Sequence, residues 1–137
     1  MHLSSMPINA NLRASQLRRI LVSLKGATTS VLLGDFNAAD ENEFANIVRE
    51  GYSDCGSDDN ATFGVLFPYV KNASRDRPRR QRRIDRIFAR GAIASDYALF
   101  GDKPVTDRKG RTMKCPEGKD GLLYPSDHLA VACTLSL

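Results

Sequence analysis

Cysteine is scarce in this chain, and the few cysteines have no regular spacing. The 137 residues include only Cys55, Cys115 and Cys133, and no two of them form a CxxC pair. Disulfide-stapled domains and structural zinc sites need cysteines in even numbers or in ligand spacings. The sequence therefore argues against both classes of protein, and it favours a reducing intracellular setting, either nuclear or cytoplasmic.

Long hydrophobic runs are also missing. The first 25 residues carry four arginine or lysine side chains and no continuous apolar stretch. A secretory signal needs an apolar segment of about 7–15 residues, and a membrane helix needs about 20. We therefore expect neither a signal peptide nor a membrane partner. The chain has no internal repeat, and its length is that of one ordinary domain.

Negative charge is scarce in one segment. Between Lys71 and Arg90 the chain has eight arginines and one lysine against two aspartates, and its formal net charge is +4. A positive block of this density indicates an anionic partner, most simply a nucleic acid or a phosphorylated ligand. The alternative is a solvated loop whose arginines only keep the protein soluble.

The apolar residues predict a mixed fold. They make up 42% of the chain, enough for one core, and they recur with helical spacing in some segments and as strand-like runs in others. The second helix opens with a capping-box pattern of Asp40 and Glu43, and Val48 is expected on its apolar face. The class is α/β or α+β with a sandwich-like arrangement of sheets. Helices are predicted over 9–26 and 40–51, and strands over 28–35, 61–70, 82–90, 93–100 and 128–137.

The segment "GDFN" ends a strand of the buried type with two polar side chains. In a strand, residues i and i+2 project to the same side, so Asp35 and Asn37 can point into one cleft. The carboxylate there could bind a divalent cation or take a proton from water, and the amide could donate to a phosphoryl oxygen. The alternative is an Asx-turn, in which these side chains bond their own backbone.

Two further segments carry candidate site residues. Asp127 and His128 come directly before the last predicted strand, and the chain has only two histidines. Asp85 lies within an apolar strand pattern, where a carboxylate is costly to bury unless it is paired. Pairing with His128 would fix the tautomer and orientation of the imidazole. The alternatives are an incidental Asp-His pair in a surface loop, and an ion pair of Asp85 with a neighbouring arginine.

Taken in order, these segments resemble the endonuclease/exonuclease/phosphatase family of metal-dependent phosphodiesterases. The family's GDxN, RxDxIF and SDH elements correspond to residues 34–37, 83–88 and 126–128. Weaker matches are the Thr62-Phe63 step, His2 and Ser5 at a strand end, and Arg13 with Gln16 as R-x-x-Q. Within the family, "IDRIFAR" and "YPSDHLAVACTL" are most similar to the tyrosyl-DNA phosphodiesterase branch.

The resemblance implies a fold and catalytic roles. The fold would be the C-terminal half of a four-layer α/β/β/α sandwich, the DNase I-like fold, with residues 1–137 as one partial domain. Asp35 would orient and deprotonate the attacking water, and Asn37 would help to hold that water and the phosphate. His128 would stabilise charge on the phosphorane-like intermediate, and Asp85 would hold His128 in place.

The resemblance also implies a cofactor and substrate contacts. The cofactor would be Mg²⁺ or Mn²⁺, acting as Lewis acid and template on the phosphoryl oxygens. Asp127 would lie beside this metal, and His2, Ser5 and Arg83 would bind the substrate. That substrate would be a nucleic acid, with DNA favoured over RNA.

Two elements that precede His2 in the family are missing from these residues. They are a strand ending in a catalytic asparagine and a Gln-Glu step with the main metal-ligating glutamate. The only glutamates, Glu41, Glu43, Glu50 and Glu117, do not sit at strand ends. Removing one of a set of groups that act as a unit costs most of the rate, so we expect the isolated chain to be weakly active or inactive. A separate N-terminal half of the domain is an expected partner.

Two other functions stay open on the sequence. One is a non-catalytic nucleic-acid-binding module that keeps the basic segment. The other is a phosphatase or lipid phosphodiesterase of the same family.

Overall fold

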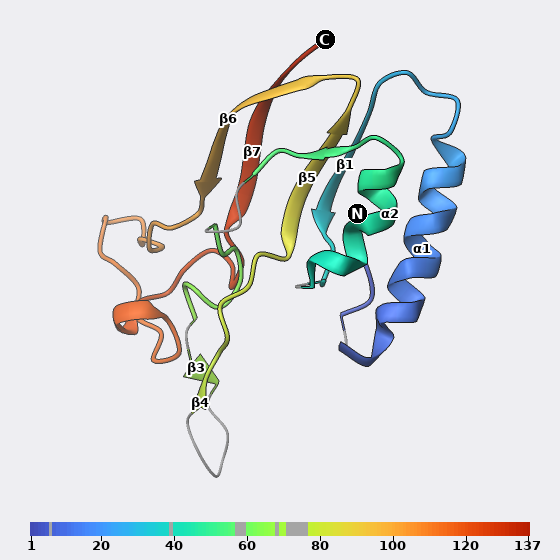
Figure 1. Cartoon of the computed structure of the whole chain (residues 1–137). Coiled ribbons are helices and arrows are strands. Elements are labelled where there is room, and N and C mark those ends of the chain that lie inside the picture. Colours follow the sequence, from blue (N-terminus) through green and yellow to red (C-terminus); the bar gives the residue numbers. More distant parts are fainter. Residues whose placement is uncertain (6, 39, 57–59, 68, 71–76) are drawn as a thin grey trace.

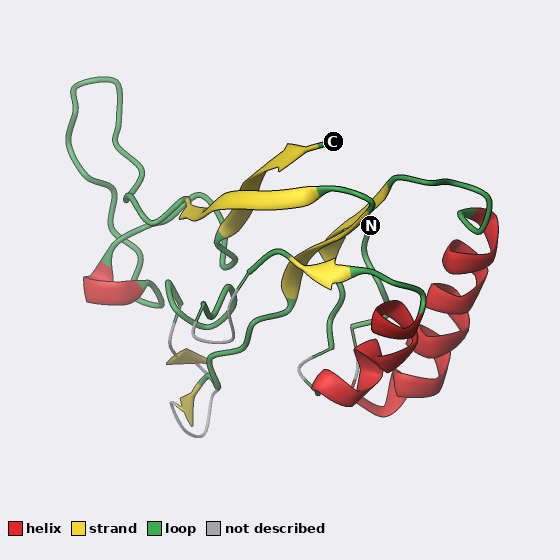
Figure 2. Ribbon diagram, turned by 45° about the horizontal axis from the view of Figure 1, so that its top comes forward, coloured by secondary structure: helices red, strands yellow, loops and turns green. Residues whose placement is uncertain are grey.

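The computed structural model describes residues 1–137 except 6, 39, 57–59, 68 and 71–76, so the first part of the arginine-rich segment lies outside the described residues. The helices are η1 (Pro7–Asn9), α1 (Ala10–Ser23), η2 (Glu41–Phe44), α2 (Ala45–Arg49) and η3 (Lys119–Gly121). The strands are β1 (Ser30–Asp35), β2 (Ser53–Asp54), β3 (Tyr69–Val70), β4 (Arg77–Pro78), β5 (Asp85–Arg90), β6 (Ile93–Phe100) and β7 (Ala130–Ser136). Figures 1 and 2 show α1 and α2 on one side of β1 and β5, and β6 and β7 on the other.

Strands β1, β5 and β2 form an antiparallel sheet with β5 in the centre. The pairing of β1 with β5 runs from Ser30 opposite Arg90 to Asp35 opposite Asp85. Side chains alternate between the two faces of a strand. Leu32 therefore faces the helices, whereas Asp35 and Asp85 project from the opposite face of the sheet, at one end of the β1–β5 ladder.

The main core lies between this sheet and the two helices. Its buried members are Leu3, Leu17, Leu21, Leu32, Phe36, Ala38, Phe44, Ile47, Tyr52 and Phe88. The rings of Phe36, Phe44 and Phe88 pack together with centroids 5.2 to 5.7 Å apart. Phe36 also donates its backbone N–H to the Ile84 carbonyl at 2.8 Å. Because Phe36 directly follows Asp35, its burial fixes the point at which the candidate site begins.

A buried arginine ties η2, β2 and β5 together. The Arg86 side chain is 2% exposed; it donates to Asp54 Oδ2 at 2.8 Å and to both carboxylate oxygens of Glu41. Its guanidinium also lies 4.3 Å from the ring centroid of Phe44. A buried charge is tolerated only when partners replace its water. These contacts therefore hold the start of β5 against the helical layer.

Strands β6 and β7 form a separate antiparallel pair, and β7 contacts β5. Burial alternates only in part along β7. Val131 and Leu135 are half-buried and Ala130 and Thr134 are exposed, but Ala132 is half-buried like its two neighbours. Leu129, at the entry to β7, packs in a second, smaller core with Leu66 and Tyr124.

The strand predicted over 61–70 is wrong as a continuous element. Among its described residues, Phe63 makes isolated bridges and Tyr69–Val70 forms a short strand. Gly64 has a φ of 77°, a left-handed conformation in which the chain leaves the strand direction. Leu66 then enters the second core instead of extending a sheet.

The helix predicted over 40–51 divides into η2 and α2. Asp40 caps it through a hydrogen bond from the Asn42 N–H at 3.0 Å. The predicted capping box is not formed, because the Glu43 carboxylate binds Arg13 at 2.7 Å instead. Val48 is exposed, contrary to its predicted place on the apolar face.

The face of β1 that turns away from the helices is partly open. Leu33 is 58% exposed, whereas its neighbour Leu32 is 2% exposed. Within the described part of the chain, no helix has the length and apolar character needed to cross a membrane.

Candidate active site

The candidate site lies where β1 and β5 reach the same end of their sheet. Asp35 is the last residue of β1, Asp85 is the first of β5, and the two are direct partners in the ladder. Both carboxylates are half-buried on the face that the helices do not cover. The antiparallel pairing thus brings together two acidic side chains that are 50 positions apart in the sequence.

His128 joins this pair from the segment before β7. Its Nδ1 lies 2.8 Å from Asp85 Oδ2, so the carboxylate orients the imidazole. The His128 N–H donates to Ser126 Oγ at 3.0 Å. The Phe63 ring packs with its centroid 5.0 Å from that of the imidazole. Asp85 and His128, which the sequence suggested as a pair, are therefore in contact.

Thr62 connects the segments that carry Asp85 and His128. It is fully buried, and its Oγ1 accepts from the backbone N–H groups of Ile84 at 3.2 Å and Asp85 at 3.1 Å. Its carbonyl accepts from the Leu129 N–H at 2.7 Å. The sequence marks this residue only through the short Thr-aromatic step, which gives no indication of the connection.

The Asp35 carboxyl has a pKa raised above its ordinary value. Burial has the largest effect and raises the pKa. The hydrogen bond from the Asn37 N–H, at 2.7 Å, opposes it; the Asp85 charge adds to it, and His128 and His2 lower the pKa. A carboxylate whose pKa is raised toward neutrality is better suited to accept a proton from water.

Asn37 forms the Asx-turn that the sequence left open. Its φ is 52°, and its backbone N–H bonds the Asp35 side chain. Its Nδ2 donates to the Leu3 carbonyl at 2.8 Å. The Asp35 carboxylate nevertheless meets Asp85 and His128, so the turn and the shared cleft are compatible. In this conformation the Asn37 amide holds the N-terminal segment.

The N-terminal segment runs beside the end of β1. Asp35 donates its N–H to the Met1 carbonyl at 3.1 Å, and Leu3 donates to the Asp35 carbonyl at 2.9 Å. Gly34 allows this approach, because a Cβ there would collide with the Met1 backbone. His2 Nε2 lies 3.6 Å from Asp35 Oδ2, and the His2 side chain is 72% exposed. His2 therefore stands at the open rim of the site.

The R-x-x-Q pair on α1 anchors this segment. Gln16 Oε1 accepts from the Ser4 N–H at 3.3 Å, and Arg13 Nη1 donates to the Ser4 carbonyl at 3.2 Å. Ser5, predicted to bind substrate, is exposed. The sequence singled out Arg13 and Gln16 only by resemblance, and their contacts give the pattern a physical role.

Two predicted site residues are directed to other partners. Asp127 Oδ2 accepts from Arg79 Nη1 at 3.0 Å. The Arg83 guanidinium is buried and bonds the Asp54 carboxylate on β2. Neither contact was predicted, because the charge pattern leaves the choice among several arginines and aspartates open.

Asp35, Asp85 and His128 form a group that could hold a metal ion. Each offers one ligand atom, and these atoms lie within 4.8 Å of one another. A divalent cation would offset the repulsion between the two carboxylates, and oxygen ligands are those that Mg²⁺ and Mn²⁺ prefer. The two carboxylates of the group therefore fit such a cation.

No glutamate joins this group in the described part of the chain. Glu41 and Glu43 bind Arg86 and Arg13 respectively. Glu50 lines a groove on the helical layer. Within the part of the chain that the structure describes, the metal-ligand group contains aspartates and a histidine only.

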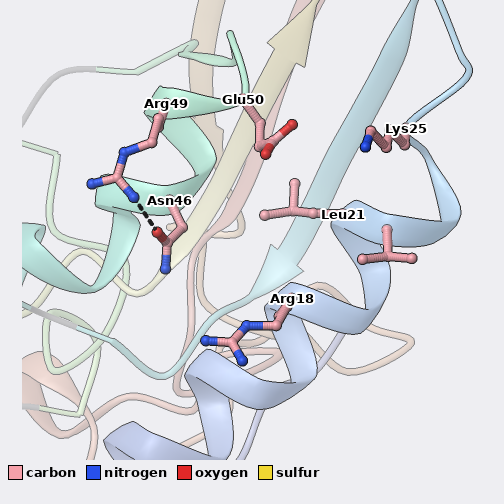
Figure 3. A pocket seen from close by; sticks show the side chains of 7 residues that line it. Arg18, Leu21, Lys25, Asn46, Arg49 and Glu50 are labelled. Carbon is pink, nitrogen blue, oxygen red and sulfur yellow. Dashed lines mark hydrogen bonds between the residues drawn. The ribbon is translucent and has the colours of Figure 1, made fainter.

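The structure has two hollows, one beside this site and one on the helical layer. One, of about 530 Å³, opens beside Asn37 and brings Arg80 and Arg82 close to it. Its lining residues are Arg13, Asn37, Asp40, Glu41, Glu43, Arg80 and Arg82. The other lies between α1 and α2, where Figure 3 shows Arg18 and Lys25 facing Arg49 and Glu50. That groove contains no residue of the Asp35–Asp85–His128 group.

Comparison with known proteins gives one family and several similar structures. Residues 1–128 match the Endonuclease/Exonuclease/phosphatase family. A TDP2 from D. rerio, humanized by 14 mutations, is 24% identical with a TM-score of 0.64, over 99% of this chain and 53% of that chain. A truncated TDP2 from Caenorhabditis elegans is 24% identical with a TM-score of 0.61, over 98% and 51%. A functionally unknown conserved protein from Enterococcus faecalis V583 is 22% identical with a TM-score of 0.62, over 99% and 48%.

These comparisons establish the fold. The chain spans about half the length of the three structures that it resembles. At this level of identity the likeness shows the fold alone, a partial domain of the α/β, DNase I-like type. No curated protein matches the chain significantly.

Proposed function

Because the chain belongs to the endonuclease/exonuclease/phosphatase family, we propose that it serves as part of a metal-dependent phosphodiesterase that hydrolyses phosphodiester bonds in DNA. The family match supports a hydrolase of the phosphodiesterase or nuclease class. The observation that carries the proposal is the meeting of Asp35, Asp85 and His128 from three separate segments, with ligand atoms within 4.8 Å of one another. A tyrosyl-DNA phosphodiesterase-like reaction is the specific form that we favour.

The three residues have separate roles in this reaction. Asp35, whose pKa is raised by burial, accepts a proton from the attacking water. Asp85 holds the Nδ1 of His128 at 2.8 Å, which leaves Nε2 as the nitrogen that faces the substrate. Through Nε2, His128 stabilises the negative charge that grows on the phosphoryl oxygens. Asn37 helps to hold the water and the phosphate once its amide leaves the Leu3 carbonyl.

The cation and the rim residues complete the site. Mg²⁺ or Mn²⁺, when bound, supplies Lewis-acid polarisation of the phosphoryl oxygens. Asp35 and Asp85 would be the carboxylates that hold such an ion. Asp127 would be available to it only when its pairing with Arg79 opens. His2 and Ser5 line the substrate groove at the N-terminal rim. Arg83 supports the groove indirectly, because its buried guanidinium binds Asp54 on β2.

Nucleic acid is the substrate class that the charges favour. Arg80 and Arg82 line the hollow beside Asn37, where three arginines face three carboxylates. The excess positive charge comes from the segment between Lys71 and Arg90, which has eight arginines and one lysine against two aspartates. Phosphate backbones bind such arginines with a steep dependence on salt. This placement favours DNA over an inositol phosphate or a lipid head group, each of which needs a closed pocket for one small group. We propose an intracellular location, nuclear or cytoplasmic, for this activity.

We also propose that a further half of the domain is needed for full activity. The chain spans about half of the structures it resembles, and Leu33 is exposed on the face of β1 away from the helices. An N-terminal half, either preceding this segment or carried on a separate chain, would cover that face and bring the missing glutamate. The isolated chain is then a weak catalyst.

Hydrolysis of a 5′-phosphotyrosyl oligonucleotide and of plain single-stranded DNA, with the chain in excess over substrate, tests the proposal. We expect slow, EDTA-sensitive hydrolysis that Asp35→Asn and His128→Ala each reduce by at least about 100-fold. This is the usual contribution of a general base, the role of Asp35, and of a donor that stabilises developing charge, the role of His128. Arg18→Ala, which removes an exposed charge on α1, is the matched control and keeps wild-type activity.

The outcomes separate the competing functions. Salt-dependent DNA binding without any EDTA-sensitive hydrolysis favours the non-catalytic binding module. Hydrolysis of an inositol phosphate or of sphingomyelin in preference to DNA favours the phosphatase or lipid phosphodiesterase. Fast turnover by the isolated chain would show that the missing half is not required.

A further inference from the structure

Arg79 lies at the rim of the cluster, in the described part of the arginine-rich segment. Its Nη1 donates to Asp127 Oδ2 at 3.0 Å, and the two side chains are 27% and 47% exposed. Its guanidinium carbon also lies 5.4 Å from the centroid of the Phe63 ring. The roles assigned above to Asp35, Asp85 and His128 make no use of this charge.

Phe63 places the Arg79 guanidinium on the His128 side of the site. The Phe63 ring centroid is 5.0 Å from that of the imidazole, and the Phe63 backbone bridges to His128 and to Arg82. Asp127, the ion-pair partner of Arg79, directly precedes His128 in the chain. Two independent contacts therefore hold the guanidinium next to the imidazole.

Arg79 can exchange Asp127 for another anion with little loss of stability. A partly exposed ion pair contributes only about 0–1 kcal/mol to stability. A guanidinium binds phosphate through two parallel charge-assisted hydrogen bonds, which are stronger. Arg83 and Arg86 differ in this respect, because both are buried and share the Asp54 carboxylate. Arg79 is thus a cation near His128 that a ligand can take over without breaking the core.

We propose that Arg79 is a phosphate-binding residue of the substrate site, which exchanges Asp127 for a phosphate of the bound nucleic acid beside His128. The inference rests on the proposed function for the class of ligand, but it requires no hydrolysis. In the free protein Asp127 neutralises Arg79, and substrate binding displaces this carboxylate.

Fluorescence anisotropy of a fluorescein-labelled oligothymidylate with the full chain, in EDTA and across a salt series, tests the proposal. We expect Arg79→Ala to weaken binding about 10-fold, because one charge-assisted phosphate contact is lost. The slope of log affinity against log salt should fall by about 0.7. Arg79→Lys should recover part of the affinity. Arg18→Ala, which removes an exposed charge of α1, is the control and should leave both quantities unchanged.

Asp127→Asn separates ligand binding from a structural role. If Arg79 binds phosphate, removing the competing carboxylate tightens binding. If the ion pair only shapes the rim, Asp127→Asn and Arg79→Ala break the same contact and weaken binding together. Circular dichroism should give wild-type unfolding midpoints for both variants, because the pair is partly exposed.

Three results would overturn the inference. They are equal affinity of Arg79→Ala and Arg18→Ala, weaker binding by Asp127→Asn, and no salt-dependent binding by the wild-type chain. A failure of the proposed hydrolysis is a different result, seen only with metal present. The Arg79 variants in EDTA can therefore succeed or fail independently of catalysis.

Discussion

Asp35 is held in a conformation that suits chemistry more than stability. Its carboxylate is half-buried opposite Asp85, with which it is paired in the ladder. Burial and the Asp85 charge raise the pKa of Asp35. The hydrogen bond from the Asn37 N–H and the nearby histidines offset this rise only in part, so the pKa stays raised. Its negative form is therefore less favourable in the folded protein than in the unfolded chain.

Asp35→Asn should accordingly stabilise the fold near pH 7. A raised folded-state pKa means that the native protein binds the Asp35 proton more tightly, so wild-type stability falls as pH rises through that pKa. We expect the variant to melt a few degrees higher at neutral pH, and the difference to shrink toward the ordinary pKa of 3.8. Thermal unfolding between about pH 4 and pH 7 measures this.

Asp102→Asn is the control for this measurement, because Asp102 is exposed and lies in the segment after β6. A difference between wild type and Asp35→Asn that stays constant across this pH range would contradict the assignment of the raised pKa to Asp35.

At the scale of elements, the start of β5 is held by charge as well as by apolar packing. Asp54 on β2 accepts hydrogen bonds from both Arg83 and Arg86, and Arg86 also reaches Glu41 of η2. Asp85 begins the same strand. The network therefore positions a site residue although it lies on the helix side of the sheet.

Asp54→Ala should destabilise the protein by about 3 kcal/mol, the lower end of the range for breaking a buried ion pair. The loss is limited because Arg86 keeps Glu41 as a partner. Urea unfolding monitored by circular dichroism measures the change. Asp102→Ala, which removes an exposed carboxylate after β6, is the matched control and should leave the midpoint nearly unchanged. Equal midpoints for the two variants would show that the network contributes nothing.

On the scale of the whole molecule, the face of β1 turned away from the helices is partly open in the described part of the chain. Figures 1 and 2 show helices on one side of β1 and β5, and the β6–β7 pair reaches β5 on the other side. Leu33 on β1 stays exposed, although Leu32 next to it is buried in the core. This is the face that the further half of the domain proposed above would cover.

The two neighbouring leucines should respond differently to a charge. Leu33→Glu should change stability by no more than about 0.5 kcal/mol, as for other surface sites, and should reduce self-association of the isolated chain. Leu32→Glu should prevent folding, because it buries an unpaired charge. Sedimentation velocity over a concentration series, with circular dichroism for folding, measures both effects. Unchanged self-association in Leu33→Glu would mean that another surface is responsible.

Local patterns were enough to predict the elements that carry the site. The helical spacing of Leu17 and Leu21 indicates α1, the run before Asp35 indicates β1, and the alternation after His128 indicates β7. Each depends on which side of its own element must be buried. The costly position of Asp85 in an apolar strand likewise indicates that it needs a partner, and the partner is His128.

Only the tertiary structure decided which of several possible partners each polar group takes. Arg79 binds Asp127, Arg83 binds Asp54, and the Asn37 amide turns to Leu3 rather than into the cleft. Charges attract without regard to sequence position, so a chain rich in arginine and aspartate permits many pairings, and packing selects among them. The neighbouring residues in the sequence determine whether a polar side chain lies on a helix or a strand. Which other side chains it contacts, and therefore its chemistry, depends on how the helices and strands pack together.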